Sequence, residues 1–135
     1  MAKQIFINIP VKNLRKSIVF FKKTGFKFNA KFTNTKGGCL IISENIFVML
    51  VTEKFFQTFT KKKIIDAKKN TETIIALSFD SRKQVDEFMA KVLNAGGKEI
   101  KKPADYGYMY ERNFQDIDGH NWAPFYMDHS KFPKK

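Results

Sequence analysis

The residues that could carry chemistry in this 135-residue chain are few and lie far apart in the sequence. Of its two histidines, His120 follows a turn-forming run and His129 lies in a basic tail, so we interpret both as solvent-exposed rather than as metal ligands. The single cysteine, Cys39, lies in an apolar segment that has no histidine to activate it, which is typical of a buried small hydrophobic residue. The amide of Asn8 could orient a ligand carbonyl or hydroxyl, or it could be a structural hydrogen-bonding group.

The segment 105–112 concentrates three tyrosines, two acids and an arginine. If it borders a cavity, Tyr108 and Tyr110 would stack on a planar ligand and Arg112 would pair with an anionic group. In the other interpretation, Glu111 and Arg112 point outward and the tyrosines are half-buried strand residues. The sequence leaves both open. The 15 phenylalanines exceed what so small a core requires, so we expect some of them to line a pocket or an oligomer interface.

The first half of the chain alternates as a strand, then a helix, then three further strands. Asn13 is a good N-cap for the helix, and Gly25 is a good terminator. Apolar residues recur with a period of two in the extended stretches and of about four in the helix. The predicted strands are residues 3–11, 26–32, 38–43 and 46–52.

The same order of elements restarts after an irregular connector at residues 53–71, for which we expect at most a short helical turn. A helix begins at Ser81 and ends at the Gly96-Gly97 pair. The second set of predicted strands is residues 73–79, 99–102, 106–114 and 121–127, with Pro103 and the turn at 116–119 separating the last three.

Two βαβββ units in one short chain predict an α+β fold. Neither unit could bury its apolar face alone, so we expect a single domain over residues 1–135, made of units 1–60 and 70–130 with the connector between them. The helices are expected on the outer face of a curved mixed sheet, and a cleft on its inner face.

Two motifs are similar to those of a known family. Residues 9–14 (IPVKNL), followed by Ser17, the Phe20-Phe21 pair and Gly25-Phe26, resemble the opening of the vicinal oxygen chelate superfamily, which includes glyoxalases, bleomycin-resistance proteins and extradiol dioxygenases. Residues 116–122 (DIDGHNW) are similar to the closing turn of that family. The resemblance covers residues 4–128 and is nearest to the branch described as glyoxalase-like or predicted lactoylglutathione lyase.

The resemblance implies a divalent metal held by up to four side chains, two from each unit. Transferred one at a time, the metal-ligand positions of the family fall on Phe6, on or next to Met49, on Ile74 and on Ala123. All four residues are apolar and provide no oxygen, nitrogen or thiolate donor. We therefore expect no metal and no other cofactor, and no classical metal-dependent glyoxalase I activity.

The resemblance then leaves two functions open. One is a binding protein that holds a small neutral or anionic aromatic or carbonyl compound in an apolar cleft, with Phe125 beside the positions named above. The other is a lyase, isomerase or dioxygenase with a relocated metal or a metal-free site, so whether the chain is an enzyme stays undecided. Relatives usually dimerise, and we expect a homodimer.

The net charge of +12 would suit an anionic partner such as nucleic acid. However, only Arg15, Arg82 and Arg112 among the 25 basic residues are arginines, and the lysines are scattered over every segment. This pattern predicts weak polyanion binding at most, without specific nucleic-acid recognition. The longest apolar run, residues 46–51, is too short to cross a bilayer, so we expect no membrane partner and a cytoplasmic protein.

Overall fold

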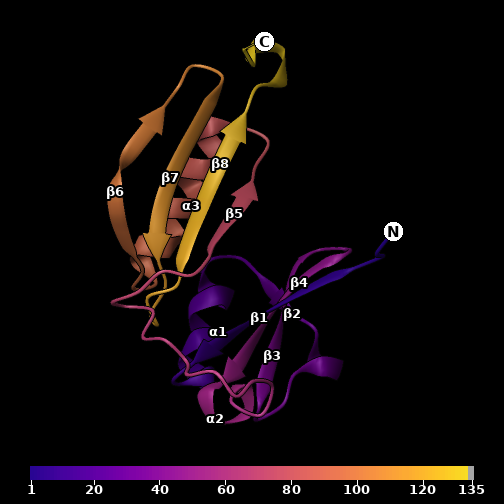
Figure 1. Ribbon diagram of the computed structural model, residues 1–135. Helices are drawn as coiled ribbons and strands as arrows, with labels where there is room; N and C mark the ends of the chain where they lie inside the picture. The colour runs from indigo at the N-terminus through magenta and orange to yellow at the C-terminus, as the bar shows by residue number, and fades with distance from the viewer. Residues whose placement is uncertain (134–135) are drawn as a thin grey trace. The chain divides into compact units, whose positions relative to one another are not determined.

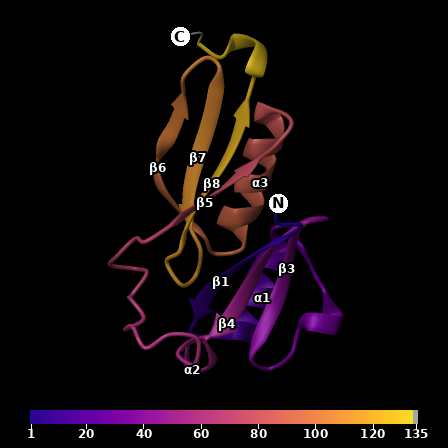
Figure 2. The ribbon, with the colours of Figure 1, turned by 45° about the vertical axis from the view of Figure 1, so that its right-hand side comes forward.

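Two units with the same order of elements make up the chain. The computed structural model describes residues 1–133, and the chain divides into Met1–Ile65 (unit 1) and Asp66–Lys135 (unit 2). Each unit contains one four-stranded mixed sheet with a long helix on one face (Figures 1 and 2). This confirms the predicted α+β class and the repeated βαβββ order. Residues 134 and 135 of the predicted domain lie outside the described residues.

Unit 1 forms its sheet in the order β1-β4-β3-β2, and β1 pairs with β4 in parallel. The helix α1 is capped by the Asn13 side chain, which accepts a hydrogen bond from the backbone N–H of Lys16 at 3.0 Å, and the chain leaves it through Gly25 at a φ of 106°. The elements are β1 (Ile5–Val11), α1 (Leu14–Lys23), β2 (Lys27–Phe28), a 3-10 turn (Ala30–Phe32), β3 (Gly37–Ser43), β4 (Ile46–Thr52) and the short α2 (Glu53–Phe56).

The core of unit 1 lies between its sheet and α1. Val48 and Leu50 of β4 are fully buried on the side of the sheet that faces α1. Gly38, the partner of Leu50 on β3, lies so close to Ile18 of α1 that an added Cβ would stand 3.2 Å from that side chain. Residues that alternate with these on each strand therefore project from the opposite side, which we call the open face of the sheet.

Unit 2 repeats this arrangement with the sheet order β5-β8-β7-β6 and a parallel β5–β8 pair. Ser81 caps α3 by accepting a hydrogen bond from the backbone N–H of Gln84 at 3.1 Å. In Figure 1, α3 lies behind the sheet. The elements are β5 (Ile74–Ser78), α3 (Arg82–Asn94), β6 (Lys98–Asp105), β7 (Met109–Gln115), β8 (Asn121–Met127) and a 3-10 turn (His129–Lys131).

The core of unit 2 is aromatic and lies against α3. The rings of Phe114 on β7 and Trp122 on β8 stack at 6.1 Å, with 4° between their planes. Phe88 of α3 approaches Phe114 to 5.9 Å between ring centroids. In unit 1 the side of the sheet that carries Val48 faces the helix, and in unit 2 the side that carries Phe114 does. In each unit, the strand residues that alternate with these form the open face.

Two strand predictions were wrong. The stretch 26–32 forms only a two-residue strand, because Asn29 accepts a hydrogen bond from the backbone N–H of Lys31 and starts a 3-10 turn. The predicted break at Pro103 does not occur, since β6 continues to Asp105 with a register irregularity between Lys101 and Ala104. β6 is an edge strand, where a proline costs no ladder hydrogen bond.

Within residues 1–133, none of the helices combines the length and the apolar character that crossing a lipid bilayer requires.

Candidate functional site

The open face of unit 1 carries four of the residues singled out in the sequence. Asn8 on β1 lies opposite Met49 on β4, and Met49 lies opposite Cys39 on β3, so the three form one row across the sheet. In the neighbouring row, Phe6 stacks on Phe47 with ring centroids 4.8 Å apart. Phe6 is 49% exposed. This face is a largely apolar surface with one amide, and Asn8 is exposed on it.

Cys39 is buried, as the sequence predicted. Burial raises the pKa of its thiol. The thiol therefore stays protonated at neutral pH and is a poor nucleophile.

The open face of unit 2 carries Ile74, Ala123 and Phe125. Ala76 on β5 is the direct partner of Ala123 on β8, and Ser78 is the partner of Phe125. Ile74 is 58% exposed, whereas Ala123 is buried. Two methyl side chains, of Ala76 and Ala123, thus lie side by side on this face, next to the position of Phe125.

The four positions that the resemblance assigns to metal ligands do not fit a divalent cation. Phe6 and Met49 lie on the open face of unit 1, and Ile74 and Ala123 on that of unit 2, and none of the four side chains supplies an oxygen, nitrogen or thiolate donor. Within the described range 1–133, no three His, Cys, Asp or Glu side chains gather as a group that could hold a metal ion. The side chains at these four positions therefore cannot coordinate a divalent metal ion.

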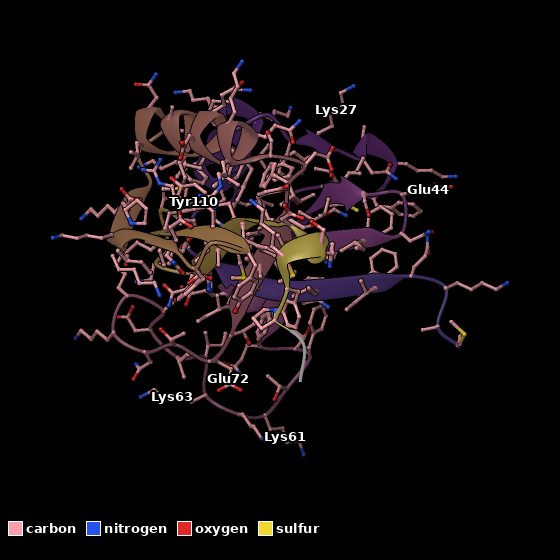
Figure 3. The ribbon with its side chains drawn as sticks, turned by 90° about the horizontal axis from the view of Figure 1, so that it is seen from above. Lys27, Glu44, Lys61, Lys63, Glu72 and Tyr110 are labelled. Atoms are coloured by element: carbon pink, nitrogen blue, oxygen red, sulfur yellow. The ribbon has the colours of Figure 1, made fainter. Side chains whose placement is uncertain are left out.

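Tyr110 and Arg112 lie on the helix-facing side of unit 2, away from Ala123 and Phe125. The Tyr110 hydroxyl donates to Asp86 of α3 at 2.6 Å, and Figure 3 shows Tyr110 between the sheet and α3. Burial and the neighbouring Asp86 carboxylate raise the pKa of Tyr110. The structure does not bring this tyrosine together with the open-face residues.

Arg112 is held by two carboxylates of its own unit. Its Nε and Nη2 donate to the two carboxylate oxygens of Glu99 at 2.8 and 3.0 Å, and its Nη1 donates to Asp86 at 3.1 Å. Only 16% of its side chain is exposed. The Glu99 hydrogen bonds raise the pKa of Arg112 above its usual range. Its charge is thus neutralised inside the unit, and we do not assign it to an anionic ligand.

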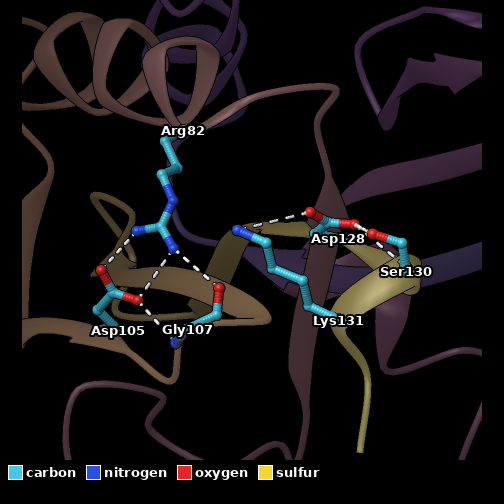
Figure 4. A network of polar contacts seen from close by, with 6 residues as sticks. All are labelled: Arg82, Asp105, Gly107, Asp128, Ser130 and Lys131. Atoms are coloured by element: carbon cyan, nitrogen blue, oxygen red, sulfur yellow. Dashed lines mark hydrogen bonds and ion pairs between the residues drawn. The ribbon is translucent and has the colours of Figure 1, made fainter.

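Tyr108 belongs to a second cluster, at the β6–β7 turn. Its ring contacts Phe132 edge-on at 5.1 Å. Nearby, Arg82 of α3 forms a two-pronged ion pair with Asp105 and also donates to the Gly107 carbonyl at 3.2 Å, as Figure 4 shows. The Arg82 guanidinium lowers the pKa of Asp105 to about 2.

The 3-10 turn after β8 is held by a separate set of contacts, also drawn in Figure 4. Asp128 accepts hydrogen bonds from the backbone N–H and the hydroxyl of Ser130, at 3.0 and 2.6 Å, and pairs with Lys131 at 4.0 Å. These contacts tie down the turn that carries His129, whose side chain is exposed as predicted.

The closing turn is built around a buried carboxylate. Asp116 accepts hydrogen bonds from Trp122 Nε1 at 3.0 Å and from the backbone N–H groups of Asp118 and His120 at 2.9 and 3.0 Å. Burial raises the pKa of Asp116. His120 is half-buried in this turn, not exposed as the sequence suggested, because its backbone N–H and carbonyl are both hydrogen-bonded to the buried Asp116. The turn has a structural role in positioning that strand.

On the open face of unit 2, sequence reasoning missed the polar residue Asn113 and left the direction of Glu111 open. Glu111 lies opposite Phe125, and the same register places Asn113 opposite Ala123. Asn113 is only 6% exposed, and its Nδ2 has no hydrogen-bond partner among residues 1–133. The signal was in the alternation of the strand, since Glu111 and Asn113 must face away from Tyr110 and Arg112.

Several lysines lie away from these faces. Lys61 and Lys63 extend from the connector, and Lys27 extends from β2 (Figure 3). All three are exposed. They are solvated charges rather than part of a shaped site.

Comparison with known proteins identifies the fold. No protein-family model and no curated protein sequence matches the chain. Among solved structures, it is similar to the hypothetical protein SA1046 from S. aureus, at 28% identity over 93% of this chain and 94% of that one, with a TM-score of 0.79.

Two more distant matches carry functional names. A glyoxalase-related enzyme from Fulvimarina pelagi matches at 16% identity over 93% of this chain and 88% of that one, with a TM-score of 0.77. The fosfomycin resistance protein FosX from Listeria monocytogenes matches at 15% identity over 100% and 96%, with a TM-score of 0.67. The opening and closing motifs and these matches agree, and the chain has the fold of the glyoxalase/bleomycin resistance/dioxygenase superfamily.

Proposed function

We propose that this chain is a metal-independent binding protein that takes a small neutral or anionic aromatic or carbonyl compound on the open faces of its sheets. The observation that carries the proposal is the side-chain chemistry of the four positions Phe6, Met49, Ile74 and Ala123, which offer apolar contact where a metal centre would need donors. Stacked aromatic rings such as Phe6 and Phe47 suit a planar ligand.

The net charge of the chain supports a ligand that is not cationic. A chain of +12 attracts anionic compounds and repels cationic ones, and it does not discriminate against neutral ones. Because no three His, Cys, Asp or Glu side chains gather into a possible metal site among residues 1–133, we place binding before catalysis. A homodimer remains part of this proposal, and light scattering on the purified chain would measure it.

Thermal-shift measurements on the purified full-length chain test the proposal. We expect members of a panel of small aromatic acids and thiol conjugates to raise the melting temperature, because a ligand that binds only the folded state stabilises it. Phe6→Ser should reduce that shift. Val19→Ser on α1, whose side chain is 46% exposed, is the matched control and should not.

Turnover assays on the stabilising compounds separate binding from catalysis. We expect no product with or without added zinc, nickel, iron or manganese. Metal-dependent product formation would instead support a lyase, isomerase or dioxygenase with a relocated site. A panel that produces no thermal shift at all would overturn the binding proposal.

A further inference from the structure

The start of the connector combines phenylalanines and lysines in one short stretch. Residues 53–65 (EKFFQTFTKKKII), which we call the Phe-Lys segment, contain three phenylalanines and four lysines but only one carboxylate, Glu53. The segment belongs to unit 1 and begins with α2, which packs on β1 and β4 of that unit. The proposed function involves none of these residues.

The three phenylalanine rings form a cluster that leaves one ring in water. Phe59 meets Phe55 nearly edge-on at 5.0 Å between ring centroids and lies 6.0 Å from Phe56. The ammonium of Lys36 lies over the Phe55 ring, 5.2 Å from its centroid. Phe59 is nevertheless 53% exposed, and Ile65 at the end of the segment is 44% exposed. Two large apolar side chains of one short segment thus stay available for contact with apolar material from outside the chain.

The lysine run is held beside this cluster by Gln57. The Nε2 of Gln57 donates to the backbone carbonyls of Thr60 and Lys62, both at 2.9 Å. Lys61, Lys62 and Lys63 are exposed, and Figure 3 shows Lys61 and Lys63 extending outward from the connector. None of the three forms an ion pair with another residue in the range 1–133. Their positive charge is therefore not neutralised within the part of the chain that the structure describes.

Exposed apolar side chains next to unpaired lysines suit a partner surface that is both anionic and apolar. A bilayer with anionic headgroups has both properties, because hydrocarbon lies directly beneath its layer of negative charge. Single-stranded nucleic acid is also anionic, but it is held by base stacking on aromatic rings and by arginine. Ile65 has no ring on which a base could stack, and the Phe-Lys segment contains no arginine. The side chains therefore favour the bilayer.

We propose that the Phe-Lys segment docks the chain on the surface of an anionic membrane. Phe59 and Ile65 enter the headgroup region, and the lysines at 61–63 contact lipid phosphates. Such a contact requires neither a shaped pocket nor a helix that crosses the bilayer. The expectation of no membrane partner rested on the absence of a spanning segment and does not bear on a surface contact.

Cosedimentation of the purified full-length chain with lipid vesicles tests the proposal. One set of vesicles is made of phosphatidylcholine alone, and the other of phosphatidylcholine mixed equally with phosphatidylglycerol. At about 0.1 M salt, we expect the chain to bind the anionic vesicles at least tenfold more tightly than the neutral ones, because each lysine near the anionic surface adds attraction.

The apolar contribution is tested by Phe59→Ser. It should weaken binding to the anionic vesicles at least threefold, because less apolar surface is then removed from water on docking. Phe32→Ser is the matched control. Phe32 is 58% exposed and also has a lysine ammonium, that of Lys31, 5.9 Å from its ring centroid, but no lysine run follows it. This variant should bind like the wild type.

The electrostatic contribution is tested by replacing all three lysines at 61–63 with glutamine. We expect binding to the anionic vesicles to weaken at least tenfold. The control K16Q/K27Q/K91Q removes the same charge from three exposed lysines outside the segment and should weaken binding less than threefold. All replaced lysines are exposed, so both triple variants should keep the melting temperature of the wild type.

Four results would overturn the proposal. The first is no binding to the anionic vesicles, and the second is an equal loss in each variant and its control. The third is binding of a thymidine oligonucleotide that depends on Phe59 while the vesicles stay unbound, which would assign the segment to nucleic acid. The fourth is a lower mass of Phe59→Ser in light scattering with unchanged vesicle binding, which would assign it to a contact between two copies of this chain. None of these results bears on the binding of a small compound on the open faces.

Discussion

Side-chain direction on one strand, β7, decides which residues can meet a ligand. Tyr110 and Arg112 face α3, whereas Glu111 and Asn113 occupy the open face. The guanidinium of Arg112 donates its hydrogen bonds to Glu99 and Asp86. A residue whose hydrogen bonds are filled inside its own unit holds the helix to the sheet rather than a substrate.

We expect Arg112→Met to destabilise the chain by about 1–2 kcal/mol, because it leaves the half-buried Glu99 carboxylate without its partner, whereas the Asp86 side chain is 52% exposed and stays hydrated. Urea unfolding at neutral pH measures the change. Lys83→Met is the control: it removes the exposed 3.9 Å pair with Glu87, and should cost less than about 0.5 kcal/mol. Equal effects of the two substitutions would contradict a stabilising role for the Arg112 cluster.

The sequence allowed part of the candidate site to be predicted. A period of two along β1 is enough to place Asn8 and Phe6 on the same face, and the structure has them there. For the segment 105–112, alternation alone did not show that Arg112 is held inside the unit, because its pairing partners lie on α3 and β6. Such partners are 13 and 26 residues away in the chain, and no local pattern reveals them.

At the scale of elements, the predictions that rested on local backbone chemistry were the accurate ones. The caps at Asn13 and Ser81 and the β4 and β8 boundaries agree with the structure. The errors at β2 and β6 arose where tertiary pairing overrides local preference. The edge position of β6, which tolerates Pro103, is a property of the sheet and not of the strand itself.

Gly119 lies where the closing turn meets the connector, two segments that the sequence alone does not show to be in contact. It lies in the closing turn at a φ of 95°, and an added Cβ would stand 2.7 Å from the backbone nitrogen of Lys68 in the connector. We expect Gly119→Ala to cost more than about 2 kcal/mol, because strain at positive φ adds to a clash with backbone that cannot move aside cheaply. Chemical denaturation followed by the fluorescence of Trp122 measures it.

The control for this prediction is Gly96→Ala. Gly96 also has a positive φ, of 105°, but nothing lies within 4 Å of an added Cβ. It should cost about 1 kcal/mol from backbone strain alone. If the two alanine variants lose the same stability, the connector does not pack on the closing turn as described.

At the scale of the whole molecule, the excess of positive charge is diffuse. Two of the three arginines, Arg82 and Arg112, are engaged with carboxylates of unit 2. The remaining excess comes mainly from exposed lysines, such as Lys61 and Lys63, which can attract a polyanion but not read its sequence.

We therefore expect only weak, sequence-independent binding to DNA. Fluorescence anisotropy with a labelled duplex should give an affinity that falls by about 100-fold or more between 50 and 200 mM salt, since it rests on displaced counterions. A duplex of scrambled sequence is the control and should bind within about twofold. Sequence-dependent affinity that persists at physiological salt would contradict this expectation.

The parallel pairs β1–β4 and β5–β8 also affect the order in which the two sheets can form during translation. Each sheet is completed only when its fourth strand joins its first, so neither can be finished from its hairpins alone. Every residue of the β1–β4 pair has been translated by Thr52, well before Ile74 is added. All strands of the unit 1 sheet are therefore synthesised before the first strand of the unit 2 sheet. The unit 1 sheet can thus begin to form in the nascent chain while unit 2 is still being translated.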